Sequence, residues 1–281
     1  MKSELLIVTN GFKGTWPAIE YGAALARSLR IKTTLLGVTE ELNPAAIDDH
    51  HPLEEIFARA VELFQRSDVA YSLDVRNGAA EKIVPAVANK GDFITVVGPL
   101  GRPLLRHMLT GRSIRSLMEQ IQNPLLYVPE ARLPLKKILI TAGGLGYEEA
   151  AENLAIQTAS ANQATITIVY VVPPTDLDYH TTRQVHGHLK DLIETDSLPG
   201  RSLKKALEAA QQAGTDARAV TRQGNIVDEI LAEIKEGDYD LVCMGSAYSA
   251  HTLRQYYTPN ITAEVAEGTR CPVLTARHKP A

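Results

Sequence analysis

The segment that decides the fold occurs twice, as Leu5-Leu6-Ile7-Val8-Thr9-Asn10-Gly11 and as Ile138-Leu139-Ile140-Thr141-Ala142-Gly143-Gly144. Each is a short apolar run ending in small or polar residues, which is typical of a buried strand that leads into a turn. An Ala-rich helical pattern follows each run, over 18–29 and 147–159, and then a second strand-like segment, over 33–38 and 165–172. The chain therefore contains an internal repeat, offset here by 133 residues.

The repeat resumes further along both copies. The stretch from Asp92 to Gly98 parallels the stretch from Asp238 to Gly245, and apolar strands over 125–128 and 273–276 follow Pro124 and Pro272. The offset has grown to about 147. The extra residues lie between Val172 and Gly224, where 180–194 and 201–212 have helical patterns. The second copy therefore carries an insertion around its second helix.

Each copy alternates strands with helices, and its strands are nearly continuous runs of Val, Ile and Leu. That pattern predicts an α/β fold made of two doubly wound, five-stranded parallel sheets in tandem. We expect domains at 1–130 and 136–281, joined by a short linker with prolines at 129 and 134 that keeps them packed together. The fifth strands, 125–128 and 273–276, are apolar edges, which we expect to pair across a pseudo-twofold axis.

Composition excludes several classes of protein. The 281 residues include 29 basic and 33 acidic ones, a net charge of −4, which argues against attraction to nucleic-acid phosphates. No apolar run approaches the roughly 20 residues of a membrane span, and the run after Met1 is too short for a signal peptide. The two cysteines, Cys243 and Cys271, cannot form a disulfide framework, and we expect them to be buried and inert. These features favour a cytoplasmic protein.

A glycine spacing in the first copy resembles that of a known family. Gly98 and Gly101 are followed, nine residues on, by Gly111, and then by Pro124. Each copy resembles a universal stress protein domain, and the chain resembles a tandem universal stress protein, whose fold is Rossmann-like and adenine nucleotide alpha hydrolase-like. The ATP-binding branch of that family carries Gly, two residues, Gly, nine residues, Gly and then Ser or Thr.

The chain departs from that family pattern in both copies. In the first, Arg112 stands where the family has a hydroxyl residue, with Ser113 next, and Asn10 replaces the usual Asp at the end of the first strand. The second copy keeps Gly245 only. Tyr248 and Pro259 stand where the family has its second and third glycines. Asn260 stands at the position of the hydroxyl residue, and Gly143 at that of the first-strand Asp.

Physical chemistry favours a nucleotide at this place in the first copy. Ligands of open α/β sheets bind beyond the carboxyl ends of the strands, where the strand order reverses. Glycines let the backbone approach a ligand and adopt positive φ, and a helix that begins near Arg112 adds free N–H groups. No acidic residue occurs from 93 to 118, whereas five basic ones do: Arg102, Arg106, His107, Arg112 and Arg115. Alternatively, the arginines are solvated or face a partner, and the glycines form a plain turn.

The resemblance implies a set of nucleotide-binding residues in the first domain. The set is Val8, Asn10, Val38, Val97, Gly98, Gly101, Arg102, Gly111, Arg112 and Ser113. The three valines would lie near an adenine, although core packing also explains each of them, and Asn10 would bond the adenine edge or the ribose. The implied cofactor is ATP or AMP. Whether Mg²⁺ accompanies it, and whether any nucleotide binds, stay open.

We expect the second copy to bind no nucleotide. Pro259 lacks a backbone N–H and suits the first position of a helix with Thr258 as N-cap, and Tyr248 is bulky where close approach is needed. We therefore expect at most one nucleotide per chain. Asn10 cannot act as a general base, so we assign no catalytic residue and expect at most slow ATP hydrolysis.

Other motifs favour plainer interpretations. Asp48-Asp49-His50-His51 reads as a solvated loop rather than a metal site, and His186-Gly187-His188 only faintly resembles a nucleotidyltransferase motif. Two functions remain in competition. One is a nucleotide-binding stress-response or regulatory protein, and the other is a nucleotide-independent module that acts by dimerisation or by binding another protein. A ligase or adenylyltransferase lacks a supporting motif.

Overall fold

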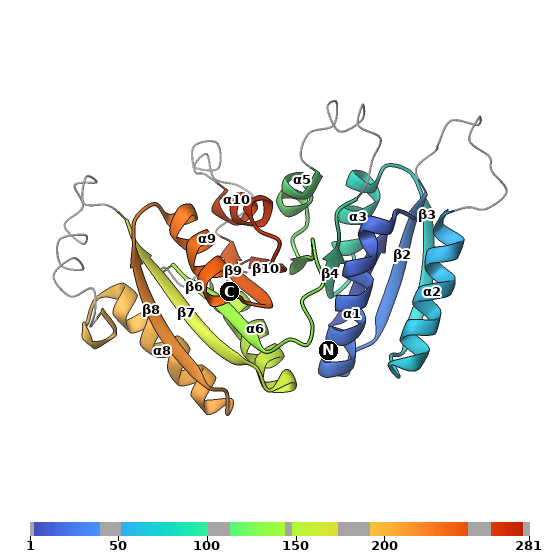
Figure 1. Cartoon of the computed structure of the whole chain (residues 1–281). Coiled ribbons are helices and arrows are strands. Elements are labelled where there is room, and N and C mark those ends of the chain that lie inside the picture. Colours follow the sequence, from blue (N-terminus) through green and yellow to red (C-terminus); the bar gives the residue numbers. More distant parts are fainter. Residues whose placement is uncertain are drawn as a thin grey trace. The chain divides into compact units, whose positions relative to one another are not determined.

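The computed structural model describes residues 3–39, 52–100, 113–143, 148–173, 192–246 and 260–277 (Figure 1). The motifs at 48–51 and 186–188, and Tyr248, lie outside these residues. The chain forms two compact units, unit 1 over Met1–Ala131 and unit 2 over Arg132–Ala281. Each unit is described by itself.

Unit 1 alternates strands and helices, as the hydrophobic pattern predicts. Its elements are β1 (Glu4–Thr9), a 3₁₀ turn η1 (Lys13–Thr15), α1 (Trp16–Leu29), β2 (Thr33–Thr39), α2 (Pro52–Arg66), β3 (Tyr71–Asn77), α3 (Ala80–Ala88), β4 (Phe93–Val97), α5 (Ser113–Gln120) and β5 (Leu125–Tyr127). The strands pair in parallel in the order β3-β2-β1-β4-β5, so β5 lies at one end of the unit's order, as expected for an edge.

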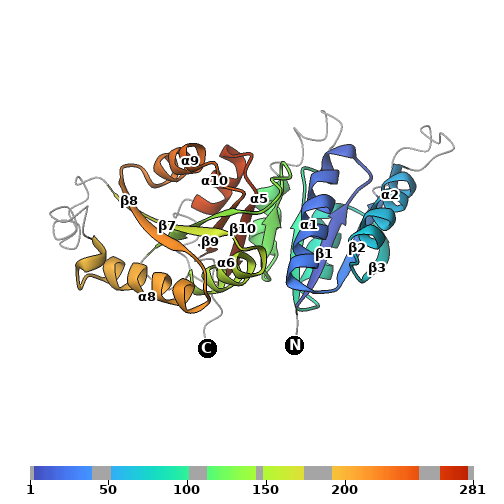
Figure 2. The same ribbon diagram turned by 60° about the horizontal axis from the view of Figure 1, so that its bottom comes forward.

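The two faces of this sheet carry different helices. α1 contacts α2, and α3 contacts α5 (Figures 1 and 2). A Cβ added at Gly22 of α1 would lie 2.5 Å from Cδ1 of Ile7, and one added at Gly37 of β2 would lie 2.5 Å from Leu53 of α2. Ile7 and Gly37 therefore mark the face under α1 and α2. Because side chains alternate along a strand, Val8 and Val38 lie on the other face.

Unit 2 repeats the plan of unit 1, with a longer connection between its second and third strands. Its elements are β6 (Lys137–Ala142), α6 (Glu149–Asn162), β7 (Thr165–Val172), η3 (Leu192–Glu194), α8 (Leu198–Gln212), β8 (Ala217–Gln223), α9 (Ile226–Gly237), β9 (Leu241–Ser246), α10 (Ile261–Gly268) and β10 (Val273–Arg277). The strand order β8-β7-β6-β9-β10 matches that of unit 1. The chain therefore folds as two tandem Rossmann-like domains.

Helix ends confirm the repeat and correct one prediction. The C-caps of α1 and α6 are Arg30 and Gln163, 133 residues apart, and both adopt the left-handed conformation, with φ of 54° and 52°. In α10, however, the N-cap is Asn260, whose side chain accepts a hydrogen bond from the Ala263 N–H at 3.0 Å. The prediction of Thr258 as N-cap, with the helix starting at Pro259, is therefore wrong. An Asn side chain closer to the helix takes the capping role.

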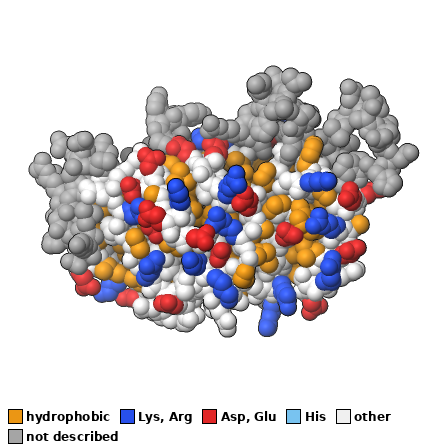
Figure 3. Space-filling view, viewed as in Figure 1, with side chains coloured by type: hydrophobic (Ala, Val, Ile, Leu, Met, Phe, Trp, Pro, Cys, Tyr) orange, Lys and Arg blue, Asp and Glu red, His pale blue; other side chains and the backbone are white. Residues whose placement is uncertain are grey.

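On the face drawn in Figure 3, the described residues show no dominant charge. Figure 3 shows acidic and basic side chains interspersed over the face in view, with hydrophobic ones between them. Within the described residues, no helix combines the length and the apolar character that crossing a membrane requires.

Candidate functional site

The topological switch point of unit 1 lies at the carboxyl ends of β1 and β4. From β1 the chain builds β2 and β3 to one side, and then returns to build β4 and β5 on the other. Such reversals leave a crevice outside the carboxyl ends of the strands. The fold brings five predicted site residues to this edge: Val8, Asn10, Val38, Val97 and Gly98.

The three valines are part of the core. Val8 of β1 is in register with Val97 of β4, and Val38 lies on the same face of neighbouring β2. Each has 0% of its surface exposed. Their first role is therefore packing, which is the alternative that the sequence left open.

A chain of hydrogen bonds fixes the turn between β1 and α1. The Gly11 N–H donates to Thr9 Oγ1 at 3.2 Å, the hydroxyls of Thr9 and Thr15 lie 2.6 Å apart, and Thr15 Oγ1 donates to the Phe12 carbonyl at 2.8 Å. Because Thr15 uses its proton on Phe12, the Thr9 hydroxyl is the donor between the two. The end of β1 is thus held by neutral groups that are buried and paired.

Gly98 is a glycine because of close packing against this turn. A Cβ at position 98 would lie 3.1 Å from the Thr15 Cα and 3.3 Å from the Gly14 carbonyl oxygen. The positive φ at this edge belongs instead to Gly11, at 86°. The glycine at 98 therefore lets the end of β4 pack directly against the start of α1.

The helix expected after the glycine loop is present. α5 begins at Ser113 and buries Leu117 and Met118, and Ile121, which directly follows the helix, is buried as well; these are three of the four residues that predicted it. The other predicted site residues lie outside the described part of the chain: Gly101, Arg102, Gly111 and Arg112.

Unit 2 differs from unit 1 at the corresponding edge. Glu148, the N-cap of α6, lies 133 residues after Thr15, the N-cap of α1. The Glu148 carboxylate is 4% exposed, and its Oε1 accepts hydrogen bonds from the Gly143 N–H at 3.3 Å and from Ser202 Oγ at 3.1 Å. A buried carboxylate thus bonds the backbone N–H directly after β6, at the position that corresponds to Asn10.

Further acidic groups surround that carboxylate. One turn along α6, burial and the neighbouring Glu148 raise the pKa of Glu152 to about 7, and Lys205 partly opposes this shift. Burial and Glu148 also raise the pKa of Tyr170 on β7. Glu149 forms an ion pair with Lys205 at 3.3 Å. The carboxyl edge of unit 2 is therefore an unfavourable place for a phosphate.

The repeat offset could have revealed this contrast from sequence. Residues 5–19 contain Lys13 and no acidic residue, whereas residues 138–152 contain three glutamates, Glu148, Glu149 and Glu152, and no basic residue. Glu148 lies outside the glycine, Asp and hydroxyl positions on which the family resemblance rests, so those positions do not reveal it.

The cysteines are placed as expected for inert thiols. Cys243 and Cys271 are both buried, and burial raises the pKa of each, to about 12 for Cys271. Cys271 Sγ donates to the Tyr239 carbonyl at 3.1 Å. Among the described residues, no cluster of three or more His, Cys, Asp or Glu side chains could hold a metal ion.

Comparison with known proteins identifies the family. The model of the universal stress protein family matches residues 134–277, about half of the chain. The chain belongs to the universal stress protein family. A universal stress protein of Methanothermobacter thermautotrophicus is 28% identical over 143 residues, which cover 50% of this chain and 95% of that protein.

Two solved structures share the fold over both units. A universal stress protein from Archaeoglobus fulgidus superposes with a TM-score of 0.68 at 14% identity, covering 98% of this chain and 96% of that one. A functionally unknown protein from Pseudomonas aeruginosa superposes with a TM-score of 0.66 at 15% identity, covering 97% and 92%. At these identities the likeness concerns the fold alone. The family model itself matches unit 2 rather than unit 1.

Proposed function

We propose that the chain is a tandem universal stress protein in which unit 1 binds one adenine nucleotide, ATP or AMP, at the carboxyl ends of β1 and β4. Its role is regulatory, in a stress response, with little or no catalysis. One observation carries the proposal: equivalent N-cap positions hold the neutral Thr15 in unit 1 and the buried carboxylate of Glu148 in unit 2.

Electrostatics supports nucleotide binding by unit 1 and not by unit 2. The described edge of unit 1 offers Lys13, the backbone around Gly98, and the turn held by Thr9 and Thr15. A phosphate there would meet no acidic side chain from residues 5–19. In unit 2 a phosphate would meet the Glu148 carboxylate, which already accepts a hydrogen bond from the Gly143 N–H. Like charges in a partly buried site repel strongly, so the same fold binds phosphate in one unit only.

Residues at the unit 1 edge suit roles other than hydrolysis. The Asn10 amide can donate to and accept from an adenine edge or a ribose hydroxyl, but it cannot take a proton from water. Mg²⁺ would come bound to the nucleotide phosphates, because Asn10 offers only an amide oxygen where a carboxylate would bind the ion more strongly. We therefore propose storage or sensing of the nucleotide rather than turnover.

Calorimetric titration with ATP and AMP tests the proposal. It compares the wild-type protein with two variants at the exposed residue Gly14. Gly14→Asp places a carboxylate near the carbonyl of Pro99, which directly follows Gly98 and lies 3.4 Å from a Cβ added at Gly14, and Gly14→Asn places an amide of the same shape there. We expect Gly14→Asp to weaken binding about tenfold or more, while Gly14→Asn stays close to wild type. Equal affinities in the two variants would contradict the site.

A second function is favoured by the two departures from the family pattern, Asn10 and Arg112. In this alternative the protein binds no nucleotide and acts as an interaction module, by dimerisation or by binding another protein. A wild-type protein that binds neither ATP nor AMP in the same titration would support it and contradict the first proposal.

A further inference from the structure

The third strands of the two units carry an arginine at the same position. Gly78 and Gly224 directly follow β3 and β8 and have φ of 136° and 152°, and the N–H of each donates at 3.0 Å to the carbonyl of the last residue of the neighbouring strand. Arg76 and Arg222 lie two residues before these glycines. Side chains around the two arginines can therefore be compared position by position.

In unit 2, three carboxylates enclose the arginine. Arg222 Nε lies 2.8 Å from Glu229 Oε2, and its Nη1 lies 2.8 Å from Glu233 Oε2 and 2.9 Å from Glu236 Oε2. All three glutamates come from α9. The Tyr239 hydroxyl donates to the other oxygen of Glu233 at 2.7 Å. Side chains of this network occupy the space between β8 and α9.

In unit 1 the same positions carry no acid. Glu229, Glu233, Glu236 and Tyr239 lie 5, 9, 12 and 15 residues after Gly224. The residues at the same distances after Gly78 are Ile83, Val87, Lys90 and Phe93. These four residues line a cavity of about 430 Å³ together with Arg76, Ala86 and Gly91. The space that three carboxylates occupy in unit 2 is thus open in unit 1.

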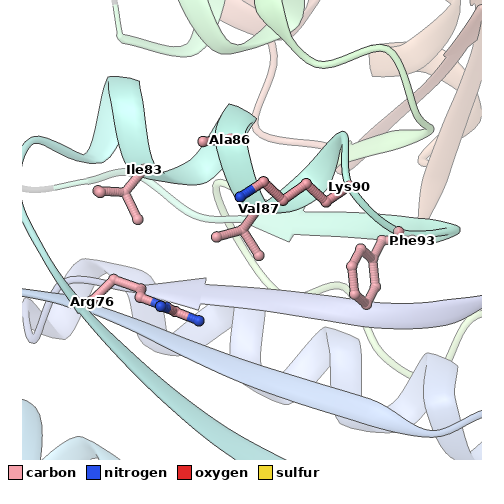
Figure 4. Close-up of a pocket in the computed structure, with 7 residues that line it drawn as sticks. Arg76, Ile83, Ala86, Val87, Lys90 and Phe93 are labelled. Atoms are coloured by element: carbon pink, nitrogen blue, oxygen red, sulfur yellow. The ribbon is translucent and has the colours of Figure 1, made fainter.

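The cavity combines positive charge with an apolar wall. Figure 4 shows Arg76 reaching from β3 beneath the helix that carries Ile83 and Val87, with Lys90 extended over Val87 and Phe93 at the far end. The side chain of Arg76 is 57% exposed, against 19% for Arg222. Its Nε contacts Asp74 at 3.0 Å, and among the described residues no acidic side chain lies within ion-pair distance of Lys90. Two cations therefore border the opening without the carboxylates that neutralise Arg222.

We propose that this cavity binds a small organic carboxylate with an apolar body. The carboxylate bonds Arg76 and Lys90, in the place that Glu233 and Glu236 take in unit 2, and the apolar part contacts Ile83, Val87 and Phe93. A guanidinium presents two parallel N–H groups that match a carboxylate, and a volume of about 430 Å³ lies within the range of small-molecule sites. Small inorganic anions would leave the apolar wall without a partner. This site is separate from the one proposed for the nucleotide.

Titration with octanoate, followed by backbone amide NMR of the full chain, tests the proposal. We expect saturable shifts that centre on Arg76, Ile83, Val87, Lys90 and Phe93. Octanol, which has the same chain without charge, and octylammonium, which has the opposite charge, should bind at least about tenfold more weakly. Equal binding of octanol would overturn the role of the cations, and an absence of saturable shifts at millimolar octanoate would overturn the site.

A charge reversal on α3 or just after it separates a specific site from general attraction. Lys90→Glu copies Glu236 into unit 1, and we expect it to weaken octanoate binding about tenfold or more. Lys82→Glu makes the same change of charge at an exposed residue of α3 that does not line the cavity, and should weaken binding far less. Equal losses in the two variants would contradict the proposal. So would tight binding of an acidic peptide that copies residues 226–237 where octanoate fails, because the cavity would then belong to a protein segment.

Discussion

The Glu233 carboxylate of unit 2 is held between Arg222 Nη1, at 2.8 Å, and the Tyr239 hydroxyl, at 2.7 Å. The carboxylate is buried, and both of its oxygens are engaged. Its charge is therefore tolerated only because Arg222 lies beside it. Three glutamates raise the pKa of Arg222 above its already high value, so the arginine stays charged at every accessible pH.

Removing Arg222 should destabilise unit 2 strongly. Arg222→Gln leaves Glu233 buried without its counter-charge, and we expect a loss of about 2–4 kcal/mol in the free energy of unfolding. Arg66→Gln breaks an exposed pair with Glu62 on α2 and should cost less than about 1 kcal/mol. Urea unfolding followed by circular dichroism measures both variants, and a loss at Arg222 no larger than at Arg66 would contradict the network's importance.

Glu152 should make stability depend on pH in an unusual direction. Burial and Glu148 raise the pKa of Glu152 from 4.5 to about 7, so the folded chain holds this proton more tightly than the unfolded chain does. Stability from this group is therefore present at low pH, falls as pH rises from about 4.5 to about 7, and stays low above that. Its buried Oε1 accepts no hydrogen bond from the described residues, consistent with a neutral acid.

Glu152→Gln isolates this effect. The neutral amide removes the ionisation, so the variant's stability relative to wild type should rise by about 1–3 kcal/mol between pH 5 and pH 8. Glu208→Gln, at an exposed position on α8, should show no such trend. Unfolding curves recorded at both pH values measure the change, and a constant difference between Glu152→Gln and wild type would refute the raised pKa.

The strands and the repeat were predictable from sequence because each depends on local pattern. Short continuous apolar runs that end in turn residues, such as 5–8 and 138–140, are typical of buried strands, and Ile114, Leu117, Met118 and Ile121 have the spacing of one helical face. The N-cap of α10 was not predictable in this way. Thr and Asn are both favourable N-cap residues, so only the folded backbone decides between Thr258 and Asn260. Within unit 1, the cavity beside Arg76 escaped prediction because it arises from missing carboxylates, which become visible only against Arg222.

Neither cysteine should react in the folded protein. Cys243 and Cys271 are buried, and their raised pKa values keep both thiols protonated at neutral pH, whereas the thiolate is the reactive form. We expect Ellman's reagent to detect no thiol in the native chain within minutes, and two thiols per chain after denaturation in guanidinium. Rapid native reaction of either cysteine would show that β9 or the start of β10 opens readily.

The asymmetry between Thr15 and Glu148 leads to a prediction of stoichiometry. We expect one nucleotide per chain in a calorimetric titration, and Gly101→Tyr should abolish it, because a bulky side chain there would block close approach to the phosphates. Tyr248→Gly restores a glycine to unit 2 but leaves the Glu148 carboxylate on the Gly143 N–H, so its stoichiometry should stay at one. Each lost phosphate donor would weaken binding by about 1–3 kcal/mol, or roughly tenfold to a hundredfold. Two nucleotides per wild-type chain would overturn the limit of one site, and binding that survives Gly101→Tyr but changes in Tyr248→Gly would place the nucleotide in unit 2.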